Sequence, residues 1–165
     1  MAQVFISFIH EEGYVAEAVE KFIRGVFCNE VAAFLSSDTG TVYAGERWMD
    51  RIVDELREAK VVISLLSEES VKRPWVNFEA GAAWIKDSVL IPVCYGNMKK
   101  ENLPKPYSSL QGVDITFPAD QYYLVYSIAR YLGMATPPEP FEKGNERFAA
   151  PYAELKDSLN FWGVD

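Results

Sequence analysis

The chain has 165 residues, of which 49% are hydrophobic and 24% charged, and its formal net charge at pH 7 is −8. This length is typical of one domain with a single core, and the composition excludes a disordered chain. The negative charge argues against nucleic acid and anionic membranes as partners. No basic segment precedes an apolar one at the N-terminus, and no apolar run approaches the length of a membrane span, so we expect a cytoplasmic protein.

Strands and helices alternate along the predicted chain. Short runs rich in β-branched residues predict five strands, at 4–8, 31–35, 61–66, 89–94 and 113–116. Apolar residues at helical spacing predict helices at 12–27, 48–60, 74–86 and 121–132. Pro74 can occupy a first helical position, and Gly133 ends the last of these helices. Residues 36–45 and 96–109 lack apolar periodicity and are predicted to be loops.

Alternating strands and helices imply a parallel sheet with right-handed crossovers. We therefore predict an α/β, flavodoxin-like fold with five parallel strands in the order 2-1-3-4-5 and helices on both faces. In such folds ligands bind beyond the carboxyl ends of the strands, where the strand order reverses. The segments 8–12, 36–45, 67–75 and the residues from 95 onward should meet at that edge.

The C-terminal part of the chain predicts one further helix. Residues 134–145 contain three prolines, a glycine and an asparagine, so we expect a linker after a domain that spans residues 1–133. Within residues 146–165 an apolar stripe repeats at helical spacing through Phe148, Tyr152, Leu155, Leu159 and Trp162. We expect this helix to dock on its own domain or on a second copy of the chain.

Glu79 is the strongest candidate for a catalytic residue. It is the only ionisable residue between Arg73 and Lys86, and Trp75 lies one turn earlier on the same helical face. A carboxylate in an apolar helix is costly to bury unless it meets a partner or a ligand. A solvated or salt-bridged surface glutamate fits the same pattern. Gly81 and the neighbouring alanines favour the functional interpretation, because they leave space where a ligand could approach.

Three further residue groups fall at the predicted ligand edge. His10 follows the first strand and is either a general acid/base or a surface or ligand-contacting residue, since no partner for a catalytic triad is placed beside it. Ser36, Ser37 and Asp38 follow the second strand and fit either turn chemistry or ligand contact. Trp48 begins the second helix, where core packing is the alternative.

Motifs for metals and for common nucleotide folds are missing from the sequence. Cys28 and Cys94 stand far apart, without a CxxC pair or a Cys/His cluster, so we expect no metal site and two buried, reduced thiols. Neither GxGxxG nor GxxxxGK[ST] occurs, which excludes a Rossmann dinucleotide fingerprint and a P-loop.

Four segments, in this order, resemble the TIR (Toll/interleukin-1 receptor) family. They are Val-Phe-Ile-Ser-Phe at 4–8, Phe-Leu-Ser-Ser-Asp and the loop that follows at 34–45, Ile-Ser-Leu-Leu-Ser at 63–67, and Arg-Pro-Trp-Val-Asn-Phe-Glu-Ala-Gly-Ala-Ala-Trp at 73–84. The last segment is similar to the Ser-x-Trp-x-x-x-Glu motif of catalytic bacterial TIR domains, with Arg73 in the serine position. Ile9 and His10 replace a pair that is often polar or basic. The resemblance covers about residues 3–133.

The resemblance implies an enzyme that cleaves the nicotinamide–ribose bond of NAD⁺, giving nicotinamide and ADP-ribose or a cyclic ADP-ribose isomer. NAD⁺ is then the substrate, and no cofactor or metal is needed. Glu79 would be the catalytic carboxylate, and the residues that hold the substrate would be Phe8, Ile9, His10, Ser36, Asp38, Trp48 and Trp75. The resemblance also implies self-association through TIR–TIR contacts, activation on assembly and a role in bacterial defence signalling.

Two other functions stay open. The chain could be a non-catalytic TIR–TIR interaction module in which residues 36–48 mediate assembly. It could also be a nucleoside deoxyribosyltransferase-like enzyme, although we locate no second carboxylate-rich site for recognising a base. The sequence also fits either a complete protein or the TIR portion of a longer one, with a sensor domain or a partner protein.

Overall fold

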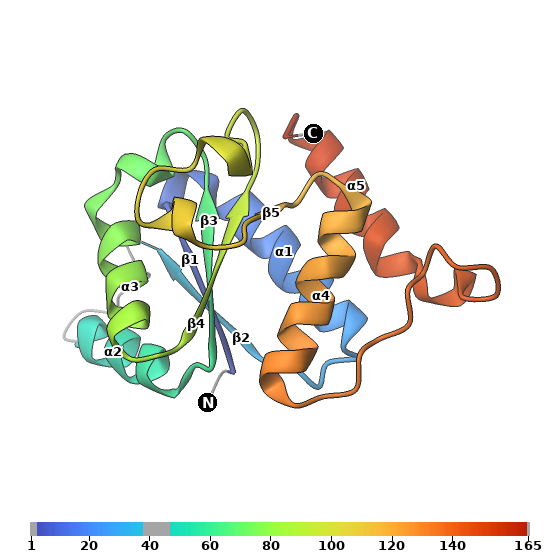
Figure 1. Ribbon diagram of the computed structural model, residues 1–165, viewed down its shortest axis with the longest axis horizontal. Helices are drawn as coiled ribbons and strands as arrows, with labels where there is room; N and C mark the ends of the chain where they lie inside the picture. Colours follow the sequence, from blue (N-terminus) through green and yellow to red (C-terminus); the bar gives the residue numbers. More distant parts are fainter. Residues whose placement is uncertain (1–2, 38–46, 165) are drawn as a thin grey trace.

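The computed structural model describes residues 3–37 and 47–164, and its ribbon is shown in Figure 1. One parallel sheet is built from β1 (Val4–Phe8), β2 (Ala33–Ser37), β3 (Val61–Leu66), β4 (Val89–Cys94) and β5 (Val113–Asp114). The strand order is β2-β1-β3-β4-β5. This confirms the predicted α/β, flavodoxin-like fold and its topology.

Helices cover both faces of the sheet (Figure 1). One face packs against α1 (Gly13–Val26), α4 (Pro118–Leu132) and α5 (Ala150–Phe161). The other face packs against α2 (Trp48–Glu58) and α3 (Pro74–Ile85). Short 3₁₀ turns connect these elements: η1 (His10–Glu12), η2 (Ser70–Lys72), η3 (Lys100–Asn102), η4 (Tyr107–Ser109) and η5 (Glu146–Phe148). The predicted loop at 96–109 therefore contains two short helical turns.

Two cores fill the space on either side of the sheet. Every residue of β1 and β3 is buried, as expected for strands that are covered on both faces. Ile6 and Ile63 belong to the core beneath α1, α4 and α5. Their sequence neighbours Phe5 and Val62 belong to the core beneath α2 and α3, because successive side chains of a strand point to opposite faces. Among the described residues no helix is long and apolar enough to cross a membrane.

The bounds of β2 and β5 differ from the predicted ones. β2 runs from Ala33 to Ser37, two residues later than expected, because its ladder is set by β1 and not by its own apolar residues. β5 is a two-residue strand in register with Val93 and Cys94, and the side chain of Asp114, its last residue, accepts bonds from Thr116 just after it. The backbone N–H and the Oγ1 of Thr116 reach Asp114 Oδ1 at 3.0 and 2.7 Å.

The two cysteines lie in different surroundings. Cys94 is buried at the end of β4, where burial, with a smaller contribution from the charge of Asp114, raises the pKa of its thiol to about 12. Cys28 is exposed just after α1, at a backbone φ of 51°. The prediction of a buried thiol is therefore wrong for Cys28, because the chain turns outward there after the last apolar position of α1.

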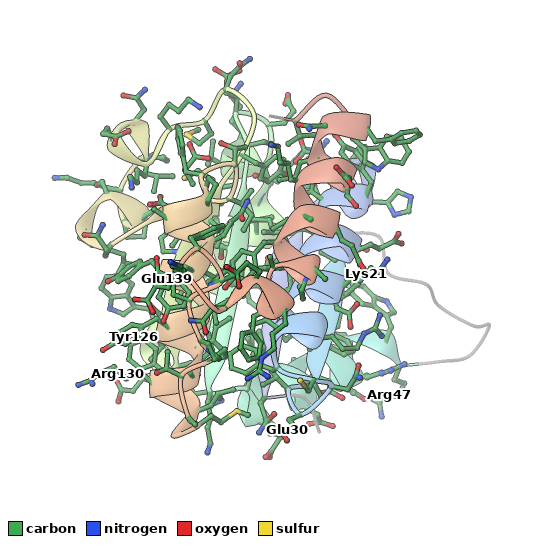
Figure 2. All side chains as sticks on the ribbon, turned by 90° about the vertical axis from the view of Figure 1, so that its right-hand side faces the viewer. Lys21, Glu30, Arg47, Tyr126, Arg130 and Glu139 are labelled. Carbon is green, nitrogen blue, oxygen red and sulfur yellow. The ribbon has the colours of Figure 1, made fainter. Side chains whose placement is uncertain are left out.

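The C-terminal helix is present as α5 and packs on α1. Tyr152, Leu155 and Leu159 are buried in the core beneath α1 and α4, while Phe148 belongs to η5. A Cβ built on Gly25 of α1 would lie 3.3 Å from ring atoms of Pro151 of α5, so the two helices approach closely. Figure 2 looks onto this side of the molecule, where Lys21 forms an exposed ion pair of 3.4 Å with Glu154.

Candidate active site

Glu79 lies on the face of α3 that packs against the sheet, and it has no solvent-exposed surface. The surface-glutamate alternative is therefore excluded. Ser36 Oγ, on β2, donates a hydrogen bond of 2.5 Å to Glu79 Oε1. Gly81 lies on the opposite, exposed side of α3, and a Cβ built on it would meet nothing within 4 Å. The expectation that Gly81 opens space beside the carboxylate is therefore wrong, because two residues along a helix turn the side chain to the far face.

Three serines form a row across the sheet beneath α3. Ser7 of β1 is in register with Ser36 of β2 and with Ser64 of β3, and all three side chains are buried. They face α3, because residues two positions earlier, Phe5 and Val62 among them, pack beneath α2 and α3. The layer between the sheet and α3 thus contains a polar strip inside an otherwise apolar core, and Glu79 is bonded at the Ser36 end of that strip.

Tyr107 of η4 encloses the Glu79 region from the side of the 96–109 segment. Its hydroxyl donates to Asn77 Oδ1 at 3.0 Å, and Asn77 Nδ2 donates to the Val71 carbonyl at 3.1 Å. Burial raises the pKa of the Tyr107 phenol to about 12; the Ser64 hydroxyl opposes this rise, and the nearby charge of Glu79 adds to it. A loop distant in sequence therefore contributes to the carboxylate's surroundings.

Aromatic side chains join the N-terminal ends of α2 and α3. The rings of Trp48 and Trp75 lie 5.4 Å apart between centroids at an interplanar angle of 45°, and Phe78 lies 5.8 Å from Trp75. The Trp75 indole nitrogen is buried, and no hydrogen-bond partner for it exists within residues 3–37 and 47–164. Trp48 and Trp75 thus form an aromatic wall that includes a buried N–H group.

A pocket of about 660 Å³ opens at the carboxyl ends of β1 and β2. It is lined by Phe8, His10, Glu11, Gly13, Tyr14, Glu17, Phe34, Leu35, Ser36, Ser37, Trp48, Arg51, Ile52 and Trp162. Four of the residues predicted to hold the substrate are among these: Phe8, His10, Ser36 and Trp48. The pocket extends from the α2 side of β2 to the α1 side, because β2 is the edge strand of the sheet.

The other predicted site residues lie elsewhere. Trp75 and Glu79 do not line the pocket, but each contacts a residue that does: Trp75 packs on Trp48, and Glu79 accepts a hydrogen bond from Ser36. Ile9 is 1% exposed and packs in the core with Ile52, so its side chain does not line the pocket. Asp38 lies outside the described residues.

Among the lining residues that sequence reasoning missed are Arg51, Tyr14 and Trp162. Arg51 of α2 is the arginine of the lining, and its guanidinium lies 5.5 Å from the centroid of the Phe34 ring. Its spacing of three residues from Trp48 places both on one helical face, a signal that could have found it. Tyr14 and Trp162 line the α1 side of the pocket, and their pairing depends on how α5 docks.

Arg73, which replaces the motif's serine, forms an ion pair of 3.1 Å with Glu11. A hydrogen bond from a backbone N–H and then the guanidinium of Arg73 hold the pKa of the Glu11 carboxyl below its ordinary value. The segment after β1 is thereby tied to the N-terminal end of α3, beside the pocket.

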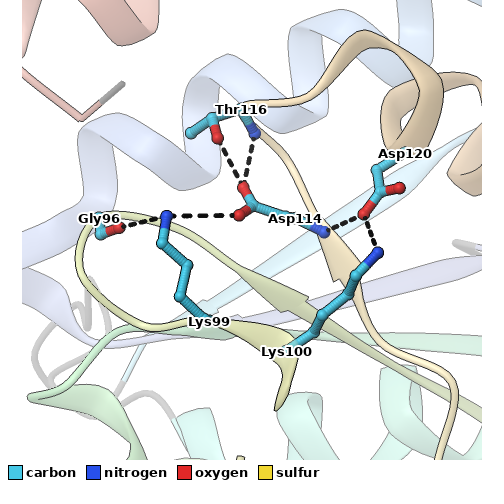
Figure 3. Close-up of polar contacts among 6 residues, drawn as sticks. All are labelled: Gly96, Lys99, Lys100, Asp114, Thr116 and Asp120. Carbon is cyan, nitrogen blue, oxygen red and sulfur yellow. Dashed lines mark hydrogen bonds and ion pairs between the residues drawn. The ribbon is translucent and has the colours of Figure 1, made fainter. Parts of the chain in front are cut away.

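A second set of polar contacts stabilises the neighbouring strand ends. Ser67 Oγ donates to both carboxylate oxygens of Glu12 at 2.9 Å, and the Tyr95 hydroxyl donates to Glu12 Oε2. Further along the edge, Lys100 reaches Asp120 at 2.8 Å and Lys99 reaches Asp114 at 3.6 Å (Figure 3). These contacts fix the segments around β4 and β5. The described residues contain no group of three or more His, Cys, Asp and Glu side chains placed to hold a metal ion.

A family model described as "TIR domain" matches residues 4–123, which include β1 to β5, Trp75 and Glu79. The chain belongs to the TIR domain family. The match ends within α4, so α5 lies outside the matched residues.

Among solved structures, this TIR domain is similar to the TIR domains of the activated Roq1 resistosome that directly recognises the pathogen effector XopQ. That alignment covers 96% of this chain and 84% of the other, with 11% identity and a TM-score of 0.42. No curated protein matches the chain significantly. The family membership therefore rests on the family model.

Proposed function

We propose that this TIR domain cleaves the bond between nicotinamide and ribose in NAD⁺, with Glu79 as the catalytic carboxylate. The observation that carries the proposal is the fully buried Glu79, bonded to Ser36, which itself lines a pocket at the strand ends. Keeping a carboxylate fully buried in an apolar layer costs several kcal/mol of desolvation, which its hydrogen bonds offset only in part. Such a cost is typical of functional sites.

The chemistry needs one carboxylate. Nicotinamide departs as a neutral molecule, so no general acid has to protonate it. The transition state resembles an oxocarbenium ion, as in other glycoside cleavages. A carboxylate beside the ribose stabilises the developing positive charge, and the low polarity around Glu79 strengthens that attraction. Capture of the ribosyl cation by water gives ADP-ribose, and capture within the same molecule gives a cyclic isomer.

Ser36 connects the pocket to the carboxylate. Its hydroxyl is bonded to Glu79 Oε1, and its residue is 1% exposed at the pocket floor. We propose that this bond orients the carboxylate toward the ribose. Glu79 has no exposed surface in this structure, so we propose that neighbouring side chains, such as Trp75 one turn earlier on α3, shift when the ribose binds.

The rest of the pocket suits the other groups of NAD⁺. Trp48 and Trp75 offer aromatic surface for the nicotinamide ring beside the reacting bond. Arg51 and His10 are the basic side chains of the lining, and a guanidinium matches the geometry of phosphate oxygens. We propose that they face the pyrophosphate, while the acidic side chains Glu11 and Glu17 keep that part of the pocket selective for a ligand of mixed charge.

We propose in addition that catalysis depends on self-association through TIR–TIR contacts, within bacterial defence signalling. Specific activity should then rise with protein concentration instead of remaining constant. Light scattering on the same samples reports the extent of assembly. A specific activity that is independent of concentration, in samples that do assemble, contradicts this part of the proposal.

The decisive experiment follows nicotinamide release from NAD⁺ by the complete chain at high protein concentration, beside the Glu79→Gln variant. Glutamine has the same shape and can still accept the Ser36 bond, so the substitution removes the charge with little change in packing. Release by the wild type and its loss in the variant supports the enzyme. No release from assembled wild-type protein overturns it and favours a non-catalytic TIR interaction module.

A further inference from the structure

The C-terminal helix contributes an aromatic side chain to the candidate substrate pocket. Trp162, at the end of α5, lines the pocket together with Tyr14 of α1. The two rings lie 4.9 Å apart between centroids at an interplanar angle of 32°. Because α5 lies outside the residues matched by the family model, this contribution belongs to the chain's own C-terminal segment.

The backbone around Trp162 is held by a helix-ending motif. Gly163 has a left-handed φ of 66°, and its N–H donates to the Asn160 carbonyl at 3.1 Å. The N–H of Val164 donates to the Leu159 carbonyl at 2.9 Å, which completes a Schellman motif. Val164 and Leu159 are both buried in the core beneath α1. Trp162 is therefore fixed in place and is not part of a fraying helix end.

Trp162 itself keeps 53% of its surface exposed, although Leu159 and Val164 on either side of it are buried. Phe161 meets it edge-on at 90°, an arrangement that covers only one edge of a ring. Trp162 and Tyr14 also line a smaller pocket of about 300 Å³, with Glu12, Ser67 and Tyr95, so the two rings form the wall that both pockets share. A fixed, half-exposed indole in a pocket wall is suited to stacking on a planar ring.

The pocket's two ends differ in their access to Glu79. Ser36 and Trp48 lie on the side of β2 that faces α2 and α3, where Glu79 is located. Trp162 and Tyr14 lie at the end that faces α1 and α5. The bond to be cleaved must lie at the Glu79 end, so the far end of a dinucleotide extends toward Trp162.

We propose that Trp162 stacks on the adenine ring of the dinucleotide, so that α5 completes the substrate site. This inference rests on the proposed function for the identity of the substrate. Trp162 does not reach the reacting atoms, and its contribution is to binding. Its loss should therefore raise KM and weaken product binding, and leave kcat nearly unchanged.

The test measures calorimetric binding of ADP-ribose, AMP and nicotinamide mononucleotide to the complete chain, together with NAD⁺ kinetics. Trp162→Ala should weaken ADP-ribose and AMP binding and raise KM for NAD⁺ about tenfold each, the usual effect of removing one base–aromatic stack. Trp162→Phe should restore most of the affinity, and Trp162→Leu should not. Trp84→Ala is the matched control, because Trp84 is an indole that is 47% exposed on α3 and does not line the pocket; it should bind like the wild type.

Several outcomes overturn the inference. Equal losses in Trp162→Ala and Trp84→Ala, or equal binding by the Trp162→Phe and Trp162→Leu variants, exclude stacking. A loss for nicotinamide mononucleotide but not for AMP contradicts the adenine assignment. If Trp162→Ala unfolds, the indole N–H resonance of Trp162 in the wild type decides, since AMP must shift it. Trp162-dependent binding of ADP-ribose without NAD⁺ cleavage overturns the proposed catalysis alone, whereas Glu79-dependent cleavage with an unchanged KM in Trp162→Ala overturns this inference alone.

Discussion

The two faces of the sheet differ in the polarity of the side chains that they bury. Beneath α1, α4 and α5 the core is continuous and apolar, with side chains such as Ile6, Ile63 and Phe22. Beneath α2 and α3 the same strands carry a row of serines, and a carboxylate with no exposed surface is bonded at one end of it. Replacing apolar packing by a buried charge lowers stability. The difference supports the proposal that the first face maintains the fold, whereas the second loses some stability because it holds a catalytic site.

Phe22→Ala should produce the largest loss of stability, on the apolar face. Phe22 is buried and packs edge-on against Tyr152 at 4.9 Å, so its truncation leaves a cavity between α1 and α5. We expect a loss of about 3–5 kcal/mol in the free energy of unfolding, measured by urea denaturation. A loss near zero would mean that α5 does not pack on α1 in solution.

On the polar face, Glu79→Gln should lower activity without lowering stability, the reverse of the effect expected for Phe22→Ala. If Glu79 stabilises the ribosyl cation as proposed, removing its charge should lower kcat for NAD⁺ by about 10²-fold or more. Stability should stay equal or rise, because a buried charge becomes a neutral amide. Stopped assays of nicotinamide release and a urea titration of the same preparation check both effects. A marked loss of stability with unchanged kcat would make Glu79 a structural residue.

Ser36→Ala should have an intermediate effect. Losing a hydrogen bond to a charged acceptor costs about 1.5–3 kcal/mol, so we expect kcat to fall at least about tenfold if the bond orients Glu79. Ser7→Ala is the matched control, since Ser7 lies beside Ser36 in the same row and makes no hydrogen bond to Glu79 among those found in the structure. Ser36→Thr should retain activity. A rise in kcat in Ser36→Ala would instead show that Ser36 masks the carboxylate.

The two thiols provide the smallest expected effect. Cys28 is exposed and should react with an aromatic disulfide reagent at pH 8, whereas buried Cys94, with a pKa of about 12, should react only after unfolding. Because the pKa of Cys94 is higher in the fold than in the unfolded chain, its protonated form is favoured at neutral pH, and this contribution to stability declines as the pH rises from about 9 toward 12. Rapid reaction of two thiols in the native protein would show that β4 opens readily.

The structure brings only some of the predicted site residues together in one pocket, for reasons of geometry. Phe8, His10, Ser36 and Trp48 line one pocket because parallel strands bring their carboxyl ends to one edge. Ile9 is adjacent to two of these residues, yet its side chain turns into the core. Chain order locates a segment at an edge of the sheet, but the direction of each side chain depends on the pairing of that segment with the rest of the fold.

The sequence by itself determined the alternation of strands and helices, the strand order and the position of Glu79 on an apolar helix one turn after Trp75. These features depend on local periodicity and on the handedness of crossovers. Only the tertiary structure decided that Ser36, 43 residues from Glu79, donates its hydroxyl to that carboxylate, and that Trp162 stands beside Tyr14 in the pocket. Both contacts depend on strand register and helix docking, which are set by packing between segments that are distant along the chain.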